Sequence, residues 1–199
     1  VIDLSASVSA TTLSFTTTLP ANTALTMDIR AGNTATPDGT WNAWATGVAS
    51  GGSISAFSGN RYFQYRANLS TTNTAVTPTL NSVSINYAQY TLTGNLTSSV
   101  YDTQSAANLI AKLTAAATGT TTNEIIKFQV RSSPDNVTWS AWCGYADTGA
   151  TCTGTNYFLD ANNGASLGST NPLRSGSDDR YLQYKVYFTS GGAFTPTLT

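Results

Sequence analysis

The chemistry open to this chain is limited first by the side chains it lacks. It contains no histidine, and Glu124 is the only glutamate among ten acidic residues. Without histidine, neither a Ser-His-Asp nor a Cys-His arrangement can activate a nucleophile. Two aspartates could still form the carboxylate pair of a glycoside hydrolase. The aspartates are Asp3, Asp28, Asp38, Asp102, Asp135, Asp147, Asp160, Asp178 and Asp179.

The positions of these acids favour a structural role. Asp3 and Asp102 occupy matching places in an internal repeat, and so do Asp38 and Asp135. An acid that recurs in each copy is more typical of a structural role than of a single active site. We therefore predict no catalytic residue and no enzyme activity.

Cys143 and Cys152 are the only two cysteines. A zinc site would need about four ligands, and the chain offers no histidine and no further cysteine to complete one. The pair therefore predicts a disulfide, which is typical of proteins in an oxidising, extracellular compartment. It would close a loop of about ten residues, worth up to about 3 kcal/mol in the chain-entropy model.

Oxygen ligands for calcium are present but few. Asp160 and Asn162 precede a glycine turn, and Asp178 and Asp179 follow later in the chain. Calcium takes about six to eight oxygens, and the terminal glutamate of an EF-hand is absent. We predict no resident cofactor or metal and keep these four residues as weak calcium candidates.

Two tryptophan pairs admit two interpretations. Trp41 with Trp44 and Trp139 with Trp142 could stack on sugar rings, or they could pack into a core. Their recurrence at one repeat position favours packing. The spacing of three predicts that the two rings of a pair lie on opposite faces of a strand, with one ring near the surface.

Three sequons could accept N-linked glycans if the source organism attaches them. They begin at Asn68, Asn95 and Asn136. In a chain this rich in Asn, Ser and Thr, such matches also arise by chance.

The chain contains two copies of one pattern. A Thr-Trp-x-Ala-Trp block occurs at residues 40–44 and 138–142, and an Arg-Tyr-x-Gln-Tyr block at 61–65 and 180–184. Thr-Pro-Thr-Leu closes both copies, and Val-x-Asp opens both. Matched blocks in the same order indicate a duplicated domain of about a hundred residues, the usual domain size.

Alternation of apolar and polar residues predicts the fold class. Leu25, Met27 and Ile29 alternate with polar residues, as do Ile126, Phe128 and Val130. This period of two is typical of half-buried antiparallel strands. We predict an all-β chain of two tandem antiparallel β-sandwiches, jelly-roll-like or fibronectin-like. The predicted domains are residues 1–88 and residues 89–199, the second with a disulfide-pinned insertion at about 143–178.

The two copies are out of phase with the ends of the sequence. A strand-like stretch precedes the second Val-x-Asp block but not the first, and an alternating strand, Val83 to Tyr87, follows only the first Thr-Pro-Thr-Leu. Val1-Ile2-Asp3-Leu4 also lacks the features of a secretory signal, so we expect a mature or excised piece. The missing strands would come from neighbouring repeats of a longer chain, or from strand exchange between copies.

Composition narrows the partners. Charged residues make up 10% of the chain and the formal net charge is −1, whereas nucleic acid and anionic membranes need clustered Lys and Arg. No apolar run approaches the length of a membrane span. Aromatic residues make up 11%, which argues against disorder. We predict no nucleic-acid binding and no membrane insertion.

Four blocks together resemble a known module: residues 98–103, 130–142, 180–184 and 77–87. They are similar to a β-sandwich module repeated in large secreted and surface-anchored proteins of bacteria and archaea. The resemblance covers nearly the whole chain. It implies a sandwich on the cell surface and offers no catalytic residue to carry over.

These observations predict an extracellular, cell-surface role. The expected function is that of a structural subunit or adhesive module of a filament, sheath or surface layer, assembled head to tail in a pilus-like manner, with donor-strand exchange as one route. Its partners would be copies of itself or neighbouring repeats, with glycans as further candidates. The alternative is a carbohydrate-binding module of a larger secreted protein, with Trp41, Trp44, Trp139 and Trp142 as its ligand-facing aromatics.

Overall fold

The computed structural model describes residues 1–177 and 179–199, and this part of the chain is all-β with antiparallel pairing throughout. The helices described are three short 3-10 turns, η1 (Ser55–Phe57), η2 (Asp160–Asn162) and η3 (Pro172–Arg174). None of them has the length and apolar content needed to cross a bilayer. The predicted strand-rich class is confirmed.

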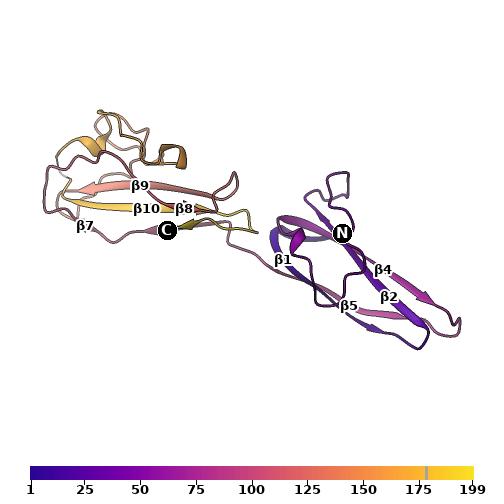
Figure 1. Ribbon diagram of the computed structural model, residues 1–199. Coiled ribbons are helices and arrows are strands. Elements are labelled where there is room, and N and C mark those ends of the chain that lie inside the picture. The colour runs from indigo at the N-terminus through magenta and orange to yellow at the C-terminus, as the bar shows by residue number, and fades with distance from the viewer. Residues whose placement is uncertain (178) are drawn as a thin grey trace. The chain divides into compact units, whose positions relative to one another are not determined.

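The chain divides into two compact units (Figure 1). Unit 1 comprises Val1–Leu92 and Gly191–Phe194. Unit 2 comprises Thr93–Ser190 and Thr195–Thr199. Each unit has its own cluster of buried apolar side chains.

Unit 1 is built around β1 (Ile2–Thr18), which changes partner along its length. Its first residues pair with β4 (Asn60–Thr71), and its later residues pair with β5 (Thr79–Ala88) and briefly with β3 (Gly52–Ser53). β2 (Thr23–Gly32) completes the sheet beside β4. The irregular register between Asp3 and Val8 lets one strand serve both partners, as bulges commonly do.

The core of unit 1 follows the predicted alternation. Met27 and Ile29 of β2 are fully buried beside Phe63 of β4 and Leu13 of β1. Leu25, the third residue of the predicted apolar face, packs against this cluster. Burial of these side chains on one face is what the period of two predicts.

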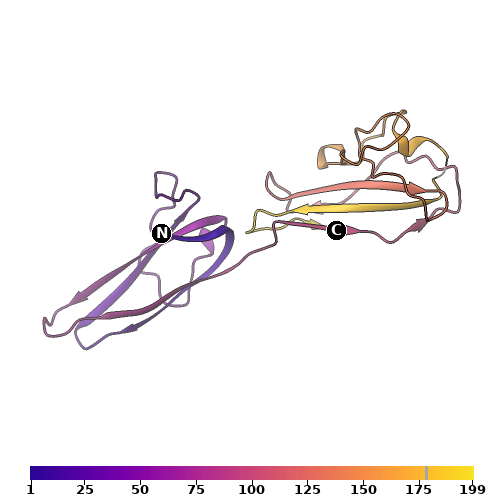
Figure 2. The same cartoon turned by 180° about the vertical axis from the view of Figure 1, so that it is seen from behind.

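Unit 2 contains a long antiparallel pair, β9 (Ile125–Ser133) and β10 (Tyr181–Thr189), which lie side by side in both views (Figures 1 and 2). β6 (Thr93–Thr97) and β7 (Tyr101–Asp102) pair with β10, and β8 (Ala117–Thr118) pairs with β11 (Thr197–Leu198). Ile126, Phe128 and Val130 of β9 face the core as predicted.

The sequence repeat is also a repeat of strand register. Arg30 lies opposite Gln64 in unit 1, and Arg131 lies opposite Gln183 in unit 2. Likewise Asp3 pairs with Tyr62, and Asp102 with Tyr181. These matches allow each position of unit 2 to be compared with its counterpart in unit 1.

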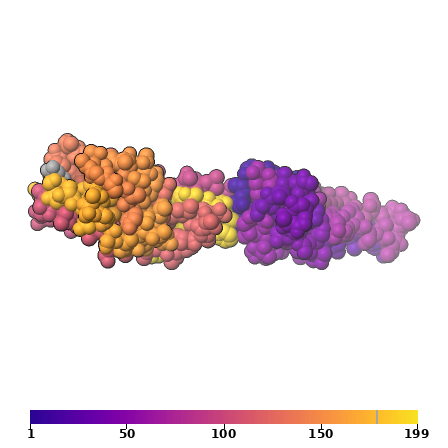
Figure 3. Space-filling view, turned by 90° about the horizontal axis from the view of Figure 1, so that it is seen from above, coloured from indigo at the N-terminus to yellow at the C-terminus, as the bar shows by residue number. Residues whose placement is uncertain are grey.

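The insertion of unit 2 has little regular structure. Between Cys143 and Ser177 it contains η2 and η3 but no strand, and isolated bridges from Cys143 and Phe158 attach it to β9. Its residues, orange in Figure 3, cover much of the visible face of unit 2. Phe158, Leu167 and Leu173 are buried, so the insertion supplies part of the core.

Candidate functional site

The tryptophan pairs each enclose an arginine. The Arg131 guanidinium lies 4.5 Å from the ring centroids of both Trp139 and Trp142. Its Nε and Nη2 donate to Oε1 of Gln183 at 3.0 and 2.6 Å. In unit 1, Arg30 makes the same arrangement with Trp41, Trp44 and Gln64.

This geometry corrects one prediction. The segment carrying each pair is irregular apart from isolated bridges, so its two rings do not lie on opposite faces of a strand. Both rings instead contact the same guanidinium. This shared contact explains why the two tryptophans keep the same spacing in both copies. It also means that each ring packs one face against the arginine.

The repeated aspartates form ion pairs and turns. Asp3 pairs with Arg61 at 2.7 Å, and Asp102 pairs with Arg180 at 3.0 Å. Each carboxylate also accepts a hydrogen bond from the N–H two residues later, where Ser5 and Gln104 have positive φ. These bonds support the prediction that the recurring acids are structural.

Hydrogen bonding lowers the pKa of two of these carboxyls to about 2. For Asp3 the main cause is its bond with Arg61, followed by that with the Ser5 N–H. For Asp135 the causes are the N–H groups of Thr138 and Val137. Because these folded pKa values lie below the ordinary value of 3.8, the bonds stabilise the fold above about pH 4.

We therefore expect the melting temperature to fall as the pH is lowered from about 4 to about 2, with little change between about pH 5 and 7. Asp135→Asn, which cannot ionise, should melt below the unsubstituted chain at pH 7 and converge with it near pH 2. Scanning calorimetry across this range checks both points. Parallel pH profiles for the two chains would contradict the assignment to Asp135.

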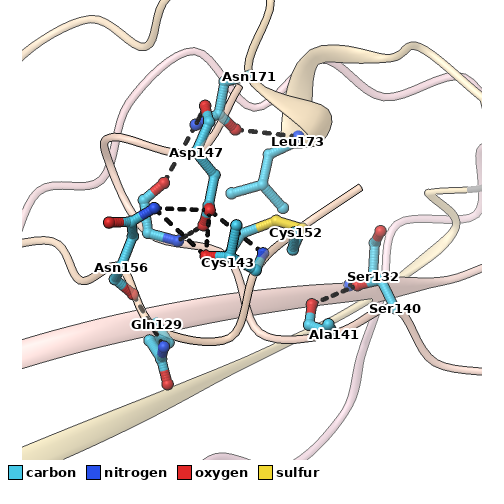
Figure 4. Close-up of a disulfide and its surroundings, with 12 residues drawn as sticks. Gln129, Ser132, Ser140, Ala141, Cys143, Asp147, Cys152, Asn156, Asn171 and Leu173 are labelled. Atoms are coloured by element: carbon cyan, nitrogen blue, oxygen red, sulfur yellow. Dashed lines mark hydrogen bonds between the residues drawn. A yellow bond between two sulfur atoms is a disulfide. The ribbon is translucent and has the colours of Figure 1, made fainter. Parts of the chain in front are cut away.

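Asp147 anchors the insertion. Its side chain is 1% exposed and accepts hydrogen bonds from the Gly144 and Thr153 N–H groups, the Thr153 hydroxyl and the Asn156 amide (Figure 4). Burial opposes its ionisation, but these bonds outweigh burial and hold its pKa below the usual value. The predicted disulfide between Cys143 and Cys152 joins the same loop.

Asn171 extends this network. Its amide donates to the carbonyl oxygens of Gly144, Tyr145 and Asp147, and its Oδ1 accepts from the Leu173 N–H (Figure 4). The two ends of the insertion are therefore tied together by the Asn171 side chain, while the disulfide closes the loop at its start.

The calcium candidates do not converge. Asp160 lines a small hollow beside Phe128, whereas Asp179 lines a different pocket beside Trp139 and accepts a bond from Ser175. Asn162 is engaged with the Leu159 N–H, and Asp178 lies outside the described residues. Across residues 1–177 and 179–199 no three His, Cys, Asp or Glu side chains are grouped for a metal ion.

The three sequon asparagines differ in their surroundings. Asn95 on β6 and Asn136 in the turn after β9 are exposed. The Asn68 amide donates to the Asp28 carboxylate at 2.9 Å, a bond that a glycan on the same nitrogen would disturb.

The two units differ most at one edge of a strand. In unit 1, Leu13 is fully buried, and β5 pairs along this edge of β1 and places Ile85 opposite Leu13. Leu113 is the counterpart of Leu13 in unit 2. Thr18 pairs with Thr79 and Thr118 pairs with Thr197, so the two threonines occupy matching positions. Leu113 precedes Thr118 by the same number of residues as Leu13 precedes Thr18. Leu113 instead lines an apolar groove of about 710 Å³ with Tyr101, Ile110, Val130 and Tyr184.

The other edge of this segment is satisfied alike in both units. In unit 1, the Gly51 and Ile54 N–H groups donate to the carbonyls of Leu13 and Thr11. In unit 2, Gly164 and Leu167 of the insertion donate to Leu113 and Ala111 at 2.9 and 2.8 Å. The insertion therefore replaces the β3 region of unit 1 at this edge.

The edge that faces β5 in unit 1 is largely free in unit 2. Among the described residues, this edge is paired only where β8 meets β11 and at one further hydrogen bond, in which the Thr199 N–H donates to the Ala116 carbonyl at 2.9 Å. The backbone groups of Lys112 and Thr114 form no hydrogen bond with the described residues. A second hollow of about 260 Å³, lined by Leu113, Tyr184 and Leu198, continues the groove.

The phase of the repeats already predicted that the second copy lacks a closing strand, but it did not place the unpaired edge at Lys112 and Thr114, and sequence reasoning did not single out Asp147 as an anchor. Leu13 and Leu113 align once the repeats are superposed, so their contrast could have been sought. The anchoring role of Asp147 has no counterpart in unit 1, and no local pattern indicated it.

Fold and site together describe an all-β chain of two related units, and among the described residues a strand pairs along the Leu13 edge of unit 1 but not along the Leu113 edge of unit 2. Comparison with protein families, curated proteins and solved structures finds no match.

Proposed function

We propose that this chain is a structural or adhesive module of an extracellular filament, sheath or surface layer, built from tandem β-sandwich repeats of jelly-roll-like or fibronectin-like type. Its units join to others when unit 2 accepts an extended strand from a neighbouring repeat or another copy. The observation that carries this proposal is the contrast between Leu13, buried under β5, and Leu113, which lines a groove.

Unit 1 supports the proposal by showing what fits such a groove. β5 pairs antiparallel with β1, and its Leu80, Val83 and Ile85 pack on the core. A strand with the same apolar spacing would pair with Lys112 and Thr114 and cover Leu113. Strand addition to an exposed edge is a common recognition mode, in which backbone bonds give affinity and side-chain pockets give specificity.

Composition and disulfide fit this role. The surface has few charges, and the Cys143–Cys152 bond is typical of an oxidising compartment. The repeated acids are engaged in turns and ion pairs, and the tryptophan pairs enclose arginines. These features favour an assembly module over an enzyme.

The test uses a peptide with the β5 sequence, residues 79–88, added to the full chain. At about a hundredfold excess over its Kd, binding should stabilise unit 2 by about 2.7 kcal/mol and raise its melting temperature by about 11–22 °C. A peptide with the changes Val83→Ser and Ile85→Ser should have little effect. Thr114→Pro, which removes an edge N–H, should weaken binding of the native peptide.

The register in which the peptide pairs with the edge gives a more specific test. Leu13 pairs with Ile85, so Leu113→Cys should form a disulfide with a peptide carrying Ile85→Cys, and Lys112→Cys should react much less. Sedimentation and electron microscopy of the concentrated chain then test for polymers. Failure of the peptide to bind, together with stable monomers at high concentration, would contradict the proposal.

A further inference from the structure

A second pocket of unit 2 lies apart from the strand edge. Its volume is about 500 Å³, within the range of small-molecule sites. Three segments form its walls: the turn after β9, the disulfide loop near Thr151, and the end of the insertion, which contributes Pro172, Leu173, Ser175 and Ser177 and is followed by Asp179. Trp139 forms part of the first wall.

Trp139 differs from its counterpart in unit 1. Trp41 is 7% exposed, and its indole N–H donates to the carbonyl oxygen and hydroxyl of Thr34 at 3.1 and 2.9 Å. Trp139 is half-buried and lines the pocket, and its indole N–H has no hydrogen-bond partner among the described residues. The Trp41 ring is therefore buried with its N–H bonded, whereas the Trp139 ring offers the pocket a hydrogen-bond donor and an apolar surface.

Two sequence differences accompany this contrast: the segment from the arginine to the first tryptophan is three residues shorter in unit 2, and a serine replaces a glycine beneath the ring. Trp41 packs so closely on Gly32 that a Cβ there would lie 2.4 Å from the ring. The matching position in unit 2 is Ser133, because Gly32 pairs with Tyr62 and Ser133 pairs with Tyr181. The Ser133 side chain is buried and bonded to Asp135, so Trp139 cannot take the inner position of Trp41.

The chemistry of the walls selects a ligand class. The lining contains no Lys or Arg, and its one described carboxylate, Asp179, is buried. Hydroxyls of Thr138, Thr151 and Ser177 lie around the same space. The Thr138 hydroxyl already donates to Asp135, but a fully apolar ligand would leave the hydroxyls of Thr151 and Ser177 without partners, and an anionic ligand would find no positive charge in the lining.

We propose that this pocket binds a neutral saccharide. One face of Trp139 is stacked on Arg131, so a sugar ring would contact the rest of the indole, and its hydroxyls would bond to the indole N–H and the wall hydroxyls. Unit 1 lacks both the insertion and the outward tryptophan, so the site belongs to unit 2. The inference does not depend on strand acceptance.

Isothermal titration of the full chain with neutral hexasaccharides of glucose, N-acetylglucosamine and mannose tests the proposal. At least one should bind with a Kd tighter than about 1 mM. Thr151→Trp fills the pocket from an exposed position and should weaken binding at least about tenfold. Ser133→Gly, which opens the inner position to Trp139, should also weaken it.

Trp41→Phe in unit 1 is the matched control and should leave affinity unchanged. Circular dichroism of each variant shows whether it remains folded. Absence of binding by all three saccharides would overturn the proposal, as would binding that survives Thr151→Trp. Tighter binding of a sulfated hexasaccharide than of any neutral one would overturn the assigned ligand class.

Discussion

Replacing Asp147 by alanine should release the insertion of unit 2 and destabilise that unit by about 3 kcal/mol, since buried donors that lose their acceptor cost about 1–3 kcal/mol each and partial relaxation recovers some of this. The carboxylate accepts four hydrogen bonds from Gly144, Thr153 and Asn156 while almost completely buried. Alanine satisfies none of these donors. Asp147→Asn keeps the shape but turns an NH₂ group toward donors, so it should also destabilise.

Hydrogen exchange measured by mass spectrometry locates this effect. Amides of residues 144–176 should lose protection first, while those of β2 and β4 should keep theirs. Asp160→Ala is the matched control, because Asp160 is an exposed acid of the same insertion whose side chain forms no hydrogen bond with the described residues. Equal protection in Asp147→Ala and the unsubstituted chain would show that the disulfide and apolar contacts alone hold the insertion.

Arg131→Ala should destabilise unit 2 by about 2–4 kcal/mol, because it removes two cation–π contacts and a charged hydrogen bond. The guanidinium lies 4.5 Å from each of the Trp139 and Trp142 ring centroids and bonds Gln183 through two nitrogens. Its loss leaves the facing sides of both rings without a partner. Equilibrium denaturation followed by tryptophan fluorescence measures the change.

Arg131→Lys separates charge from shape. Lysine keeps the positive charge but cannot place a planar fork between two rings, so this variant should recover less than half of the loss. Arg30→Ala in unit 1 should destabilise that unit by a similar amount, since the same cluster recurs there. If Arg131→Lys were as stable as the unsubstituted chain, charge alone would account for the conserved geometry.

Comparison of the two units shows how one scaffold acquires different surfaces. Gly32 admits Trp41 to an inner position, and Ser133 keeps Trp139 out of the matching one. The β3 region closes one edge of β1 in unit 1, and the insertion closes the same edge in unit 2. A substitution, a shorter tryptophan loop and one insertion thus alter the exposed surface while the register of the central strands is kept.

The sequence by itself determined the all-β class, the internal repeat, the disulfide and the strands around residues 25–29, 83–87 and 126–130, but not β1. These depend on short-range features: alternation along a strand, turn residues such as Pro134 and Asp135, and two cysteines without other ligands. The structural role of the repeated aspartates could be predicted for the same reason, because recurrence in both copies is visible along the chain.

Only the tertiary structure decided how these parts meet. It brought both rings of each tryptophan pair onto one arginine, located the expected unpaired edge at Lys112 and Thr114, and made Asp147 the anchor of the insertion. The physical reason is that edge coverage depends on partners remote in sequence, and so does the part of the Asp147 loop that Asn171 ties down through the Gly144 and Asp147 carbonyls. The bond from the Gly164 N–H to the Leu113 carbonyl is a further example, and no local pattern along the chain specifies it.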